Sequence, residues 1–128
     1  MDNKICLLSD EINKITLALI TYEEKQINDR YIEQKLTEWS NFIIEIENGY
    51  NLTIDDYTND ISLRDKIQII IDNSHQETKD KIVQRITEWD TRFIKNTNKL
   101  NEPLIPNIKR PVQWWWYRIP INSEKMGC

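Results

Sequence analysis

One pattern occurs twice in this chain, and it limits the folds that the chain can adopt. The pentapeptide KLTEW at residues 35–39 recurs as RITEW at residues 85–89, and flanking apolar residues match at the same offset of fifty. Residues 14–19 match residues 66–71 at an offset of fifty-two. Because each unit of about fifty residues holds two segments with helical periodicity, the repeat predicts two helical hairpins.

Proline and glycine usage favours helices over residues 1–100. All four prolines lie after residue 100 and the chain has only two glycines, so few residues there would break a helix. With 39% hydrophobic and 30% charged residues, the 128-residue chain fits one soluble domain. We therefore predict a single all-α domain over residues 1–128. About four main helices fill residues 1–100, and an extended segment over residues 101–128 packs on the bundle.

Apolar residues at steps of three and four place the four helices. The first apolar stripe runs from Ile5 to Tyr22, and the second helix ends naturally before Gly49. The second stripe includes Trp39, and the fourth includes Trp89 at the equivalent repeat position. Large aromatic residues on such stripes anchor a core, so both tryptophans are expected inside the bundle.

The turns between these helices contain polar cap residues. A capping box that starts at Thr21, or alternatively a cap at Asn28, would begin the second helix. Residues 50–59 are rich in Asn, Asp and Thr, which predicts a loop, with the third helix starting near Ser62. Residues 74–77 (SHQE) have the capping-box pattern and predict the start of the fourth helix.

The C-terminal segment combines the four prolines with three consecutive tryptophans. The prolines exclude a long helix, so residues 112–119 are expected to be ordered and extended across the bundle, or to form an edge strand. Side chains alternate between the two faces of an extended chain. Either Trp114 and Trp116 or Trp115 and Tyr117 would then face the helices. We expect the first pair to be packed and the second pair to be available to a partner.

Residue types that perform catalysis or bind metals are scarce. His75 is the one histidine and lies in a predicted capping turn, and no nucleophile set can be assembled around it. Asp55, Asp56 and Asp60 partly resemble a calcium loop, but its turn glycine and closing Glu are missing. The glycines are too few for a phosphate-binding loop. We therefore predict no enzymatic activity, no metal site and no cofactor.

Cysteine usage and hydropathy bear on the compartment. Cys6 and Cys128 do not have the spacing of metal ligands, which favours two free thiols in a reducing cytoplasm. The sequence has no apolar run long enough to span a bilayer and no N-terminal signal pattern. A cytoplasmic protein that does not enter membranes is the expectation.

The charge is unevenly distributed. Residues 1–80 carry 17 acidic and 8 basic side chains, a net charge of −9, whereas residues 81–128 carry 4 acidic and 9 basic, a net charge of +5. The acidic part would repel a phosphate backbone, which argues against direct binding of nucleic acid, and it would attract a basic protein. The candidate partner-binding residues are Glu45, Glu47, Asp55, Asp56, Asp60, Trp115 and Tyr117.

The acidic residues 1–80, the aspartates at 55, 56 and 60 and the Ile/Asn/Lys-rich composition give the chain a general character. In these features the chain resembles bacterial immunity proteins of contact-dependent growth inhibition and bacteriocin systems. Those proteins are small, cytosolic, often acidic, frequently helical and without catalytic motifs. The resemblance implies a non-catalytic inhibitor that covers the active site of a basic, nuclease-type toxin domain.

Two other functions are compatible with a helical frame of this kind. A helical-repeat adaptor would hold a cellular protein in the groove between hairpins. A small-molecule-binding bundle would have a pocket lined by Trp39, Trp89 and the tryptophans of the C-terminal segment.

Overall fold

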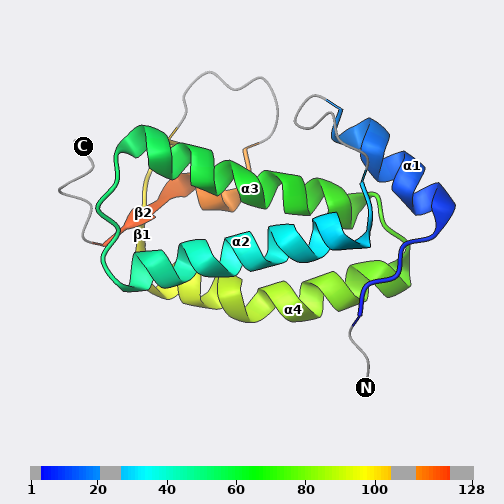
Figure 1. Cartoon of the computed structure of the whole chain (residues 1–128). Coiled ribbons are helices and arrows are strands. Elements are labelled where there is room, and N and C mark those ends of the chain that lie inside the picture. The colour runs from blue at the N-terminus through cyan, green and yellow to red at the C-terminus, as the bar shows by residue number, and fades with distance from the viewer. Residues whose placement is uncertain (1–3, 21–26, 105–111, 122–128) are drawn as a thin grey trace.

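A computed structural model describes residues 4–20, 27–104 and 112–121 of the chain. The fold is all-α apart from one two-stranded sheet, as the sequence predicts (Figure 1). The elements are α1 (Ser9–Ala18), α2 (Asp29–Glu47), α3 (Ile54–Asp72), α4 (Gln76–Lys95), β1 (Thr97–Lys99), the 3₁₀ helix η1 (Trp114–Tyr117) and β2 (Arg118–Pro120). Among the described residues, no helix is long and apolar enough to cross a membrane.

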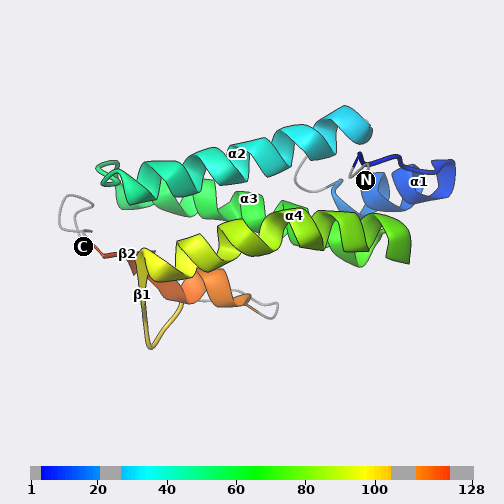
Figure 2. The ribbon, with the colours of Figure 1, turned by 90° about the horizontal axis from the view of Figure 1, so that it is seen from below.

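The three long helices α2, α3 and α4 lie side by side as a bundle, and α1 lies at one end of it (Figures 1 and 2). The helix α1 has 10 residues, against 19 in α2 and α3 and 20 in α4, so the two repeat units are unequal. Ile5 is buried, 1% exposed, but it precedes the helix instead of belonging to it. Tyr22, the predicted end of the first stripe, lies outside the described residues.

The start of α2 decides between the two caps that the sequence offers. The side chain of Asn28 accepts a hydrogen bond from the backbone N–H of Tyr31 at 2.9 Å, so Asn28 is the N-cap. Thr21 lies outside the described residues. At the other end, Gly49 follows the helix with a φ of +93°, a conformation that glycine adopts without strain.

The helix α3 begins at Ile54, well before Ser62, so the predicted loop over residues 50–59 is wrong from residue 54 onward. The helix starts early because Thr53 and Asp56 form a capping box, which the prediction overlooked in this Asn- and Asp-rich stretch. The hydroxyl of Thr53 accepts the Asp56 N–H, and the Asp56 carboxylate accepts the Thr53 N–H, each at 3.2 Å. These bonds satisfy backbone donors that a loop would leave to water.

The start of α4 is close to the prediction, but residues 74–77 do not form the predicted capping box. His75 is the N-cap and makes no side-chain cap bond. Instead, Glu11 of α1 accepts the His75 N–H at 2.7 Å and the Thr78 hydroxyl at 3.3 Å. The same carboxylate accepts the Leu8 N–H at 3.1 Å. Glu11 thus caps two helices at once and joins α1 to the bundle.

We expect Glu11→Ala to lower the free energy of unfolding by about 1–3 kcal/mol, because it leaves one buried and two partly buried hydrogen-bond donors without their acceptor. Glu11 is only 1% exposed. Urea unfolding would measure the loss. Asp10→Ala, one residue away and exposed, is the matched control and should cost less than about 1 kcal/mol. An equal effect of both changes would contradict the capping role.

The pH dependence gives an independent check on Glu11. Burial raises its pKa, but hydrogen bonds from Leu8, His75 and Thr78 outweigh burial and hold the pKa below its ordinary value of 4.5. A lowered folded-state pKa stabilises the fold above 4.5, and the contribution is lost as pH falls through the folded value. The difference in stability between wild type and Glu11→Gln should therefore shrink in acid.

The core confirms one of the two predicted tryptophan anchors. Trp39 is 0% exposed and its ring centroid lies 5.4 Å from that of Phe93. Trp89 packs against the core but is only partly buried, with the guanidinium of Arg92 4.3 Å from its ring centroid, so it lies at the edge of the core and not inside it as predicted. The inward stripe of α4 advances by four residues after Ile86 and reaches Asp90, which turns Trp89 toward the rim.

Candidate functional site

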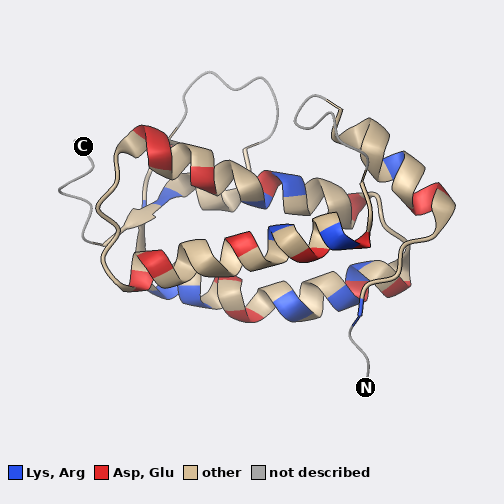
Figure 3. Cartoon of the chain, in the orientation of Figure 1, with Lys and Arg blue, Asp and Glu red and all other residues tan. Residues whose placement is uncertain are grey.

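The predicted acidic residues gather where α2 passes into α3. Asp56 and Asp60 lie one turn apart on α3, Asp55 is their neighbour in its first turn, and Glu45 lies in the last turns of α2. Figure 3 shows acidic positions in this part of both helices. We refer to Glu45, Asp55, Asp56 and Asp60 as the acidic cluster. The structure therefore brings together four of the predicted site residues.

Like charges within this cluster influence one another. Burial raises the pKa of Asp60, and the negative charge of Asp56 raises it further, although a hydrogen bond from the Tyr50 hydroxyl at 2.8 Å acts in the opposite direction. Burial also raises the pKa of Glu45, with a further contribution from Asp60. In the part of the chain that the structure describes, none of the four carboxylates has an ion pair.

A groove between α2 and α3 continues from the cluster. It encloses a cavity of about 370 Å³. Glu45 and Asp60 lie toward one end, and Lys35 and Lys66 toward the other, because the two helices run antiparallel (Figure 1). The remaining lining residues are Glu38, Asn41, Phe42, Asn59, Ser62 and Leu63. The groove is therefore polar, with carboxylates at one end and two lysines at the other, where Lys35 is paired with Glu38.

Glu47 lies apart from the acidic cluster. Its carboxylate accepts a hydrogen bond from Arg92 Nε of α4 at 2.8 Å and a second from the same guanidinium. These hydrogen bonds lower the pKa of Glu47. The ion pair joins α2 to α4, so the structure gives Glu47 an internal partner.

The tryptophan segment differs from the predicted extended chain. Residues 114–117 form a 3₁₀ turn, and only residues 118–120 form a strand, which pairs antiparallel with β1. Trp115 and Trp116 are 1% and 4% exposed, whereas Trp114 is 38% exposed. The prediction of an exposed Trp115 is therefore wrong. A 3₁₀ helix turns by about 120° per residue, so two neighbours can face inward while residues i and i+3 share the outer side.

A second cavity lies on that outer side. Trp114 and Tyr117 line it together with Ile94 of α4, and its volume is about 550 Å³. The other lining residues are Lys99, Val112 and Arg118. Trp39 and Trp89, proposed from the sequence as pocket residues, line neither of the two cavities. The sequence signal for this site was the spacing of Trp114 and Tyr117, which becomes informative once a 3₁₀ turn is assumed.

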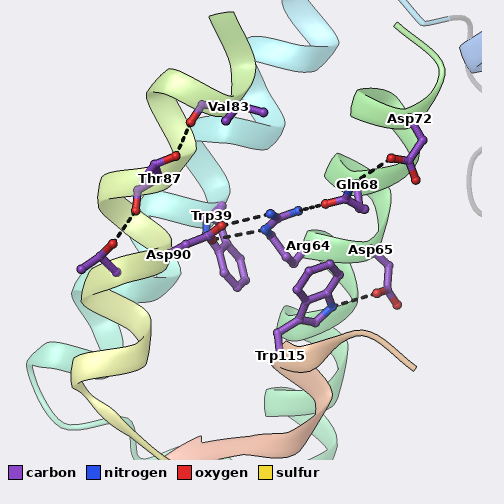
Figure 4. A network of polar contacts seen from close by, with 10 residues as sticks. Trp39, Arg64, Asp65, Gln68, Asp72, Val83, Thr87, Asp90 and Trp115 are labelled. Atoms are coloured by element: carbon purple, nitrogen blue, oxygen red, sulfur yellow. Dashed lines mark hydrogen bonds and ion pairs between the residues drawn. The ribbon is translucent and has the colours of Figure 1, made fainter. Parts of the chain in front are cut away.

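A buried polar network crosses the bundle and was not foreseen from the sequence (Figure 4). Asp90 of α4 accepts hydrogen bonds from Trp39 Nε1 at 3.0 Å and from Arg64 Nε and Nη2 at 3.2 and 3.0 Å. Arg64 also donates to Gln68 at 3.1 Å. The network ties α2, α3 and α4 together through side chains that are distant in sequence.

Asp65 fastens the C-terminal segment to α3. Its carboxylate accepts the indole N–H of Trp115 at 2.8 Å and that of Trp116 at 3.1 and 3.0 Å. Burial raises the pKa of Asp65, and the two indole hydrogen bonds act against that rise. Arg64 lies over the Trp115 ring, 4.5 Å from its centroid. Trp115 and Asp65 are therefore parts of the core and not of an exposed surface.

Over residues 4–20, 27–104 and 112–121, no group of three or more His, Cys, Asp or Glu side chains is placed to hold a metal ion. His75 is exposed, and its Nε2 lies 2.7 Å from Asp10 Oδ2, next to the capping carboxylate of Glu11. This geometry connects α1 to α4 and gives His75 a structural contact.

No protein-family model matches the chain, and comparison with curated proteins and with solved structures gave no match.

Proposed function

We propose that this protein is a non-catalytic inhibitor that binds a basic protein partner through the acidic cluster. Among such inhibitors, a bacterial immunity protein is the function we favour, acting in the cytoplasm and covering the active site of a nuclease-type toxin domain. The observation that supports the proposal is that Glu45 and Asp60 share the α2–α3 groove and that Asp60 interacts with Asp56, which Asp55 precedes in the chain. None of these four carboxylates has an ion pair within the described residues.

Clustered carboxylates repel one another, and a cationic partner would relieve that repulsion. Burial is the main reason why the pKa values of Asp60 and Glu45 are raised, and the negative charges of Asp56 and Asp60, respectively, add to it. A basic surface would lower both pKa values and would be steered to the cluster from solution. A nucleic acid would be repelled for the same reason, so a basic protein is the partner that the electrostatics favour.

The partner can be captured from the native host on immobilised full-length protein and identified by mass spectrometry. We expect a basic protein whose toxic activity is inhibited by stoichiometric amounts of this chain. A basic partner without a toxic activity would instead support the adaptor function. Capture of acidic or neutral partners alone would contradict the electrostatic proposal.

With that partner in hand, Glu45→Gln combined with Asp55→Asn should lower the association rate constant about tenfold at low salt. Within the described residues, neither side chain makes a hydrogen bond, so the fold should tolerate both changes. The difference should shrink as ionic strength rises and the Debye length falls to about 8 Å. Stopped-flow kinetics would measure it.

The matched control is Asp80→Asn combined with Glu88→Gln, which removes two exposed carboxylates from α4 outside the cluster. It should leave the association rate almost unchanged. Equal effects of the control and the Glu45→Gln/Asp55→Asn variant would show that net charge, and not the cluster, governs the encounter.

A further inference from the structure

The second cavity is built from the C-terminal end of α4, the strand β1 and the turn η1. These elements lie on the side of the bundle away from α2 (Figure 2), so the cavity is separate from the α2–α3 groove. Trp114 and Tyr117 form one wall because residues three apart in a 3₁₀ turn share a face. Ile94 and Val112 add aliphatic surface.

Apolar surface at this cavity remains in contact with water. Ile94 is 44% exposed and Trp114 is 38% exposed. The Trp114 ring is fixed in place by contacts with Phe93 and Trp115, at centroid distances of 6.0 and 5.4 Å. A rigid, partly exposed aromatic wall of this kind is a ready surface for an apolar ligand body, since binding would remove it from water without ordering new side chains.

The charged residues of the cavity are both cationic. Lys99 is exposed on β1, and Arg118 begins β2 directly opposite it in the sheet. The Arg118 guanidinium is held by Nε–H donation to Thr97 Oγ1 at 2.7 Å and by Nη2–H donation to the carbonyls of Ile94 and Thr97 at 3.1 and 2.9 Å. Among the described residues, no carboxylate lines the cavity. The Lys99 ammonium is thus an exposed positive charge beside the Arg118 charge, which hydrogen bonds hold in place.

We propose that this cavity binds a small organic anion, in which one carboxylate or sulfonate is attached to an aromatic or aliphatic body. The volume of about 550 Å³ lies within the usual range for small-molecule sites. The apolar body would pack on Trp114 and Ile94, and the anionic group would meet Lys99. This site is independent of the acidic cluster and of the inhibitor function.

The probe for this proposal is 8-anilinonaphthalene-1-sulfonate, and N-phenyl-1-naphthylamine supplies nearly the same apolar body without the charge. We expect the full-length protein to bind one equivalent of the sulfonate, measured by fluorescence titration. The indole N–H resonance of Trp114 should shift during a parallel NMR titration. The neutral probe should bind at least about fivefold more weakly.

Two substitutions test the two halves of the site. Lys99→Gln should weaken sulfonate binding about three- to tenfold and leave the neutral probe unaffected. Ile94→Glu puts a carboxylate into the cavity and should abolish sulfonate binding. The matched control, Lys95→Gln, removes an exposed α4 charge that does not line the cavity and should have no effect. Circular dichroism and thermal unfolding would confirm that each variant is folded.

Octanoate and 1-naphthoate should displace the sulfonate. Tighter binding of octanoate would indicate an aliphatic ligand body, and tighter binding of 1-naphthoate an aromatic one. Failure of both to displace it would overturn the proposal. The proposal is also overturned if the folded Ile94→Glu variant binds the sulfonate like wild type, or if Lys99→Gln leaves its affinity unchanged. Partner inhibition should be intact in Ile94→Glu, which keeps this test distinct from that of the acidic cluster.

Discussion

Asp90→Ala should lower the free energy of unfolding by about 3–5 kcal/mol, among the largest losses expected for any single substitution in this chain. Asp90 accepts two hydrogen bonds from Arg64 and one from Trp39. The side chain of Arg64 is 6% exposed and Trp39 is 0% exposed, so water cannot replace the lost carboxylate easily. Removal of one partner leaves a buried charge and a buried donor without an acceptor.

Urea unfolding followed by circular dichroism would measure this loss. Glu88→Ala is the matched control, since it removes an exposed carboxylate from the same helix and should change stability by less than about 0.5 kcal/mol. The double variant Arg64→Met/Asp90→Leu replaces the ion pair by apolar side chains and should recover most of the stability. If Asp90→Ala cost no more than the control, the network would not be a stabilising feature.

The helices could be predicted because their signals are local. The periodic stripes placed α2 and α4, Gly49 marked the end of α2, and Asn28 was one of two candidate caps for its start. The described part of residues 1–100 contains four helices, as predicted, together with the short strand β1. The start of α3 was missed because Thr53 and Asp56 were interpreted as loop composition, although their spacing is that of a capping box. The start of α3 could therefore have been predicted from the local sequence.

The interior polar contacts could not be predicted, because each joins residues far apart in the chain. Trp39 and Asp90 are 51 residues apart, and Glu11 and His75 are 64 residues apart. No spacing rule within a single helix indicates such partners. The repeat was misleading here, since Trp39 and Trp89 are equivalent in sequence, yet Asp90 occupies the inward position that Trp89 was expected to take.

The candidate site was predictable in part. Asp56, Asp60 and Glu45 could be named as candidates from the sequence, but their clustering requires α3 to begin before residue 56 and to lie beside α2. The predicted hairpins paired the first helix with the second, and residues 50–59 were expected to form a loop. The roles of the tryptophans did not follow, because alternation assumes an extended chain whereas the chain forms a 3₁₀ turn. Because of this one local difference in backbone conformation, Trp114 is the exposed residue, where Trp115 was expected to be.

Trp115→Ala should also lower the free energy of unfolding by about 3–5 kcal/mol, as large-to-small changes of buried aromatic residues do. Trp115 is 1% exposed, donates its indole N–H to Asp65 at 2.8 Å and lies under the guanidinium of Arg64. Its loss opens a cavity between α3 and the C-terminal segment and removes a hydrogen bond from a buried carboxylate. Destabilisation, and not a direct loss of partner contact, is therefore the expected phenotype.

Two further variants separate the contributions to that loss. Trp115→Phe keeps most of the ring but lacks the indole donor, so it should cost about 1–3 kcal/mol. Trp114→Ala, at the neighbouring and partly exposed position, should cost only about 1–2 kcal/mol because less apolar area returns to water. The order Trp115→Ala, then Trp115→Phe, then Trp114→Ala should appear in urea midpoints. If Trp114→Ala were the most destabilising of the three, the burial pattern of the 3₁₀ turn, and with it the aromatic wall of the second cavity, would be wrong.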